Sequence, residues 1–76
     1  MKQNIKAFVY PDNGGYVGEC PDVHAVTQGG TLDEAIANLK EVVALALANE
    51  DPADYGLAPD PPILVTIELE PLTRAG

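Results

Sequence analysis

The chain has 76 residues, 46% of them hydrophobic, and a formal net charge of −8. Such a chain forms a single domain, residues 1–76, with a thin core, because it buries only about 60% of its unfolded surface. The composition excludes a disordered tail and a membrane-spanning segment. Four basic residues are too few for direct nucleic-acid binding. The negative charge favours a basic partner, or serves only to keep a small protein soluble.

The single cysteine, Cys20, cannot form an internal disulfide. No apolar stretch of signal-peptide length follows the N-terminal lysines. Both features indicate a cytoplasmic protein, since the cytoplasm keeps thiols reduced.

The first third of the chain predicts a β-hairpin. Residues 5–10 are rich in strand-forming side chains, and Pro, Asp, Asn and two Gly follow at residues 11–15. Residues 16–20 then form the second strand. In this hairpin we expect Tyr10 and Tyr16 to face each other as a packing pair.

A third short strand is expected over residues 24–28, closed by two glycines, and a helix follows it. Thr31 and Glu34 are spaced as a capping box, which predicts that the helix begins here. Leu45 interrupts the polar side of this helix. The apolar stripe of the helix is expected to face a sheet. It consists of Leu32, Ala35, Ile36, Leu39, Val42, Val43, Ala46 and Leu47.

A proline-rich loop over residues 51–62 leads to the clearest alternation in the chain. Its apolar positions, expected to face the core, are Ile63, Val65, Ile67 and Leu69. The order β-β-β-α-β predicts an α+β fold, a two-layer sandwich in which one helix covers an antiparallel sheet.

Four short motifs follow one another within residues 8–47: Asp12-x-Gly14-Gly15-Tyr16-Val17, Glu19-Cys20-Pro21-Asp22-Val23, Thr27-Gln28-Gly29 and Thr31-Leu32-Asp33-Glu34-Ala35-x-x-Asn38-Leu39-Lys40-Glu41. In their order and spacing they resemble the HicB family of antitoxins. The resemblance implies a partial ribonuclease-H-like fold. It also implies binding to a small basic ribonuclease toxin of the HicA type. We expect no C-terminal DNA-binding domain of the kind that full-length antitoxins of this family usually add.

The sequence contains few residues in patterns that are typical of catalytic or metal-binding sites. Cys20 and His24 supply two ligands where structural zinc needs four, and a buried structural cysteine is the commoner case than an activated one. There is no serine. Glu68 and Glu70 are interpreted as a solvated strand face rather than as metal ligands. We therefore expect no enzymatic activity, no metal and no cofactor.

Two functional hypotheses follow. In the first, the chain is an antitoxin-like module whose residues Asp12, Glu19 and Asp22 meet the basic toxin. In the second, it is an orphan homo-oligomeric protein with an unrelated ligand-binding or regulatory role. A homo-oligomer is expected in either case, because the core is thin and several apolar side chains lack cover. The candidate residues for self-association are Phe8, Tyr10, Leu64 and Leu45.

Overall fold

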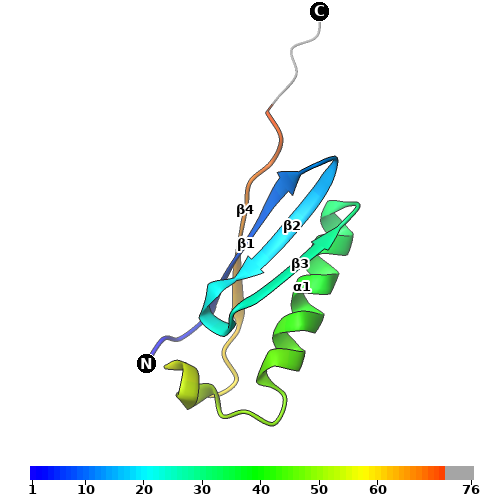
Figure 1. The fold of residues 1–76 in the computed structure, drawn as a ribbon. Coiled ribbons are helices and arrows are strands. Elements are labelled where there is room, and N and C mark those ends of the chain that lie inside the picture. The colour runs from blue at the N-terminus through cyan, green and yellow to red at the C-terminus, as the bar shows by residue number, and fades with distance from the viewer. Residues whose placement is uncertain (72–76) are drawn as a thin grey trace, which may run out of the picture.

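Four strands form one sheet, and a single helix packs on one side of it (Figure 1). The computed structural model describes residues 1–71, and the expected two-layer α+β architecture is confirmed. The helices and strands are β1 (Ile5–Asp12), β2 (Gly15–Cys20), β3 (Ala25–Gly29), α1 (Leu32–Leu47) and β4 (Ile63–Ile67), with short 3-10 helices at Pro21–Val23 and Pro52–Tyr55.

The sheet is mixed rather than fully antiparallel. Its strand order is β3-β2-β1-β4; β2 is antiparallel to both neighbours, whereas β4 runs parallel to β1. The chain reverses direction at each step from β1 through α1, so β4 points the same way as β1. The expectation of an antiparallel fourth strand was therefore wrong, because β4 lies beside β1 rather than beside β2.

The β1–β2 hairpin closes through a two-residue turn. Asn13 has φ 54° and Gly14 has φ 83°, both in the left-handed region that primed hairpin turns require. Asp12 pairs with Gly15 across this turn, so β1 continues through Pro11 instead of stopping at Tyr10. Proline is tolerated here because β4 pairs with β1 only as far as Val9, which leaves the outer side of Pro11 without a strand neighbour.

Helix α1 begins where the sequence predicts. The Thr31 side chain accepts a hydrogen bond from the Glu34 backbone N–H at 3.1 Å, one half of the expected capping box. The Glu34 carboxylate lies 3.5 Å from the Thr31 hydroxyl. The preceding Gly29 allows the helix to approach β3, because a Cβ atom there would lie only 2.5 Å from the Ala35 backbone nitrogen.

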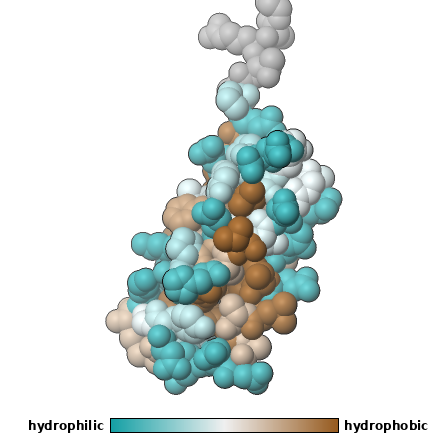
Figure 2. Space-filling view, viewed as in Figure 1, coloured by the Kyte–Doolittle hydropathy of each residue, from teal (hydrophilic) through white to brown (hydrophobic). Residues whose placement is uncertain are grey.

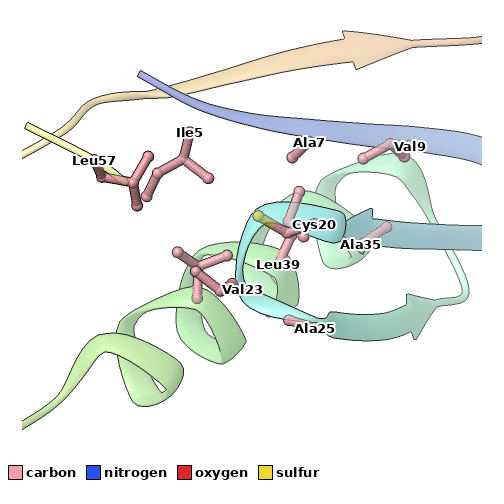
Figure 3. Close-up of a cluster of buried hydrophobic side chains, with 10 residues drawn as sticks. Ile5, Ala7, Val9, Cys20, Val23, Ala25, Ala35, Leu39 and Leu57 are labelled. Atoms are coloured by element: carbon pink, nitrogen blue, oxygen red, sulfur yellow. The ribbon is translucent and has the colours of Figure 1, made fainter. Parts of the chain in front are cut away.

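The core lies between α1 and the sheet (Figure 3). Small side chains dominate it, which allows the helix to lie close to the strands. The expected stripe of α1 contributes three buried residues, and its other members pack partly buried against the core. The ten buried residues are Ile5, Ala7, Val9, Cys20, Val23, Ala25, Ala35, Leu39, Val43 and Leu57.

Three positions differ from the expected core. Ile67, expected to face the core, is 41% exposed at the end of β4. Leu57 is fully buried although it belongs to the proline-rich segment, which is tied to the N-terminus because the Lys2 N–H donates to Gly56 and the Ala58 N–H donates to Lys2. Leu69, expected to face the core, instead lies beyond the end of β4 and is 65% exposed.

Within residues 1–71, no helix has the length and apolar character needed to cross a membrane.

Candidate functional site

No element of residues 1–71 covers the side of the sheet opposite α1, and we call this side the open face. Strand register places residues on it, because directly paired residues in neighbouring strands share a face. Phe8 pairs with Glu19 on one side and Thr66 on the other, and Tyr10 pairs with Val17. The open face consists of Lys6, Phe8, Tyr10, Val17, Glu19, Val26, Gln28, Leu64 and Thr66.

A shallow hollow of about 240 Å³ lies on this face, where β1 is flanked by β2 and by the end of β4. Phe8 and Tyr10 provide aromatic walls, while Glu19 and Glu68 provide carboxylates. The backbone N–H of Glu68 donates to Val9 at 2.8 Å, which holds the glutamate beside β1 although it follows the last residue of β4. The hollow therefore combines π-surfaces with negative charge.

One carboxylate of the hollow is held in place by a side-chain hydrogen bond. The Tyr10 hydroxyl donates to Glu19 Oε1 at 2.6 Å. This hydrogen bond raises the pKa of Tyr10 above its ordinary value, with burial and the charges of Glu19 and Asp12 adding to it. Because the phenol bonds only one oxygen, Glu19 keeps further acceptor capacity for a ligand.

The three residues expected to face a toxin do not form one cluster. Asp12 is exposed at the hairpin end of the sheet, and Asp22 lies at the opposite end. Asp22 accepts hydrogen bonds from Lys2 Nζ at 2.9 Å and from the Lys6 backbone N–H at 3.0 Å. These contacts lower its pKa, the Lys6 backbone bond being the larger cause. Of the three, only Glu19 belongs to the hollow.

Three of the four residues expected to mediate self-association share the open face. Phe8 is 42% exposed and Leu64 52% exposed, and Tyr10 lies half-buried beside Phe8. Leu45 is 68% exposed but lies on α1, on the other layer. Most of the residues expected to mediate self-association thus lie on the same face as Glu19, the candidate contact for a basic partner.

The expected Tyr10–Tyr16 pair is not present. Tyr10 pairs with Val17, and Tyr16 pairs with Pro11, so the two rings lie on opposite faces of the hairpin. Tyr16 packs against the core, whereas Tyr10 reaches Glu19. The two-residue Asn13-Gly14 turn fixes this register and is the sequence signal that would have revealed the Tyr10–Glu19 contact.

Cys20 and His24 lie in different environments. Cys20 is fully buried, its thiol lies 3.6 Å from the Lys6 carbonyl oxygen, and burial raises its pKa. His24 is exposed and has φ 55°, and its backbone N–H closes the Pro21–Val23 turn. A thiol with a raised pKa is a poor nucleophile at neutral pH. Among residues 1–71, no three potential ligands gather into a group that could hold a metal ion.

Part of the apolar surface is gathered on one face of the molecule. Figure 2 shows hydrophobic side chains side by side in the middle and lower part of this face, bordered by hydrophilic ones. In comparisons with known proteins, no family model, curated protein or solved structure matches the chain.

Proposed function

We propose that the chain is a non-catalytic binding module, an antitoxin-like protein of the HicB type that binds and neutralises a basic ribonuclease of the HicA type. The observation that carries this proposal is the hollow on the open face, in which Phe8 and Tyr10 lie beside Glu19 and Glu68. The proposal places the protein in the cytoplasm, where an unpaired cysteine such as Cys20 is stable.

An arginine side chain of the partner suits this hollow. A guanidinium group stacks on aromatic rings and donates to carboxylates, and it is more weakly hydrated than an ammonium group. Phe8 and Tyr10 offer the rings, and Glu19 and Glu68 offer the acceptors. The net charge of −8 would also accelerate the encounter with a basic protein.

The test uses the small basic protein encoded beside this chain, if such a reading frame exists, as the ligand in titration calorimetry. We expect Glu19→Gln and Glu68→Gln each to weaken binding by about tenfold, because each removes a charged acceptor worth about 1.4 kcal/mol or more. Glu41→Gln on the exposed side of α1 is the matched control, since it makes the same change in charge away from the hollow.

Two further measurements sharpen this test. Raising the salt concentration should reduce the association rate of the wild-type protein more than that of the Glu19→Gln variant. The partner's cleavage of RNA should be inhibited by the wild-type chain and less so by Phe8→Ala. Equal weakening by Glu41→Gln and Glu19→Gln would reduce the interaction to net charge alone and contradict the proposed hollow.

A further inference from the structure

Among residues 1–71, no strand lies beside the outer edge of β4. β4 is the last strand in the order β3-β2-β1-β4. In its parallel ladder with β1, the Glu68 N–H donates to the Val9 carbonyl at 2.8 Å, so alternate β4 residues direct their backbone groups toward β1. Leu64 and Thr66 belong to that set. The residues whose N–H and C=O groups point to the outer edge are therefore Ile63, Val65 and Ile67.

The opposite edge of the sheet, which β3 forms, is covered by α1. Helix α1 packs closely along β3, and the Asn38 side chain donates to the Gln28 carbonyl oxygen at 2.8 Å. Within residues 1–71, no side chain makes an equivalent hydrogen bond to β4. β4 also lacks the charged residues and prolines that protect free edges, since it reads Ile-Leu-Val-Thr-Ile.

The same β4 residues are incompletely covered on the helix side. An apolar groove of about 410 Å³ runs between α1 and β4, with Ile36 and Leu39 on one wall and Ile63 and Val65 on the other. Ile63 and Val65 are half-buried, and Ile67 is 41% exposed although its strand neighbour Val9 is fully buried. In this one strand, backbone groups point to a free edge and the side chains on the helix side are only partly covered.

We infer that β4 pairs antiparallel with β4 of a second copy of this chain, across a twofold axis at Val65. The charge distribution favours a second copy of the chain at this edge over a basic partner. Among the residues that the structure describes, no carboxylate lines the groove and Lys40 is its one charged residue, so two acidic chains would meet here with little repulsion. A basic partner would instead be drawn to Glu19 and Glu68 on the open face.

The twofold axis gives a self-complementary register. Val65 would lie opposite Val65 of the second copy, and Ile63 would lie opposite Ile67 of the second copy. The three residues whose backbone groups point outward would therefore bond to each other across the axis. Their apolar side chains would also meet on the helix side of the joined sheet. Phe8 and Tyr10 would stay free on an open face that continues through both copies, and Leu64 alone of the expected self-association patch would lie at the seam. This inference rests on the edge of β4 and not on the proposed function.

Sedimentation equilibrium at micromolar concentration tests the assembly. We expect the wild-type protein to have twice the chain mass. Val65→Pro should reduce it to the monomer, because proline removes an N–H that points outward while the bonds to β1 use other residues. Ile67→Lys should do the same by placing a charge in the seam. Val26→Lys is the matched control: it changes an apolar residue that is 67% exposed on the opposite edge strand, and it should leave the dimer intact.

Cross-linking tests the register. In an antiparallel hydrogen-bonded pair the Cα atoms lie about 5.5 Å apart, within the range of a disulfide. Val65→Cys should therefore oxidise to a covalent dimer. Ile63→Cys should not, because its two copies would lie about 13 Å apart along the strands. The buried Cys20 is fully shielded in both variants. A monomeric wild type, a dimer that survives both Val65→Pro and Ile67→Lys, or equal cross-linking of the two cysteine variants would overturn the inference.

Loss of the dimer and loss of partner binding are separable. Glu19→Gln should weaken binding of the basic partner and leave the dimer unchanged. Val65→Pro should dissociate the dimer and leave each open face able to bind.

Discussion

The two faces of the sheet are built from the same alternating strands but from different side chains. Toward α1, β1 presents Ile5, Ala7 and Val9, all essentially inaccessible. On the open face the same strand presents Phe8 and Tyr10, both partly accessible. Small residues on the covered face permit a close helix, whereas the large aromatic and acidic residues on the other face lie outside the core cluster. The first face therefore supports stability, and the second is available for recognition.

The largest expected effect comes from opening the covered face. Leu39→Ala removes a fully buried side chain of α1 and should destabilise the domain by about 3 kcal/mol, through lost apolar burial and the cavity left behind. Leu45→Ala is the matched control, because it makes the same change on the same helix where the side chain is 68% exposed. We expect it to shift stability by no more than about 0.5 kcal/mol. Urea denaturation followed by circular dichroism measures both.

The covering helix itself depends on its first turn. Thr31→Ala removes the oxygen that accepts the Glu34 N–H at 3.1 Å and should cost about 1 kcal/mol. Thr31→Ser keeps that acceptor and serves as the control. If both variants unfold at the same urea concentration as the wild type, the cap contributes nothing to the helix that separates the two faces.

A smaller effect on stability is expected at the end of the sheet, where the Asp22 carboxylate accepts hydrogen bonds from Lys2 Nζ and from the Lys6 backbone N–H. The folded-state pKa of Asp22 is lowered, so its contribution is present above the ordinary Asp pKa of about 3.9 and is lost as pH falls through the folded value. Asp22→Asn should cost less than about 1 kcal/mol at neutral pH, since Lys2 is largely exposed.

The pH dependence distinguishes this contact from an ordinary loss of packing. On acidification, the wild type should lose more stability than Asp22→Asn, and the two melting temperatures should converge. Parallel decreases in the two proteins between neutral and acid pH would show that Asp22 has the same pKa in both states.

Local signals in the sequence predicted most of the fold. The Thr31–Glu34 spacing located the helix start, and the apolar stripe identified the helix side that is buried. The direction of β4 was not predictable in the same way, because it depends on which strand β4 lies beside, and no short-range pattern encodes that choice. Leu57 was missed for a related reason: its burial depends on the bridge between its segment and Lys2, which is distant in the sequence.

The candidate site was predicted only in part. Phe8 and Tyr10 were expected among the apolar side chains that lack cover, but Glu19 was grouped with Asp12 and Asp22 as an acidic residue that meets the basic toxin. The register of the hairpin separates them and brings Glu19 to Tyr10. Glu68 lies beyond β4, so only the hydrogen bond from its N–H to Val9 shows that it reaches the hollow.

The smallest expected effect on stability, and the most direct probe of the open face, is the titration of Tyr10. Its pKa is raised mainly because its hydroxyl donates to Glu19, with burial and nearby carboxylates adding to this. Glu19→Gln removes the charged acceptor, so the Tyr10 pKa should fall toward the ordinary value of about 10. Asp12→Asn is the matched control and should lower it less, because Asp12 acts only through its charge and is the smallest contributor.

Carbon-13 NMR of labelled tyrosine resolves the titration of each ring and so measures the Tyr10 pKa in each variant. An unchanged Tyr10 pKa in Glu19→Gln would mean that the phenol and the carboxylate do not meet in solution. Binding of the basic partner gives the same titration a second use. A guanidinium group in the hollow would favour the phenolate and would compete for Glu19, and both effects lower the Tyr10 pKa. A partner that binds without changing this pKa must therefore dock elsewhere. The aromatic and acidic residues of the hollow would then not be the recognition site.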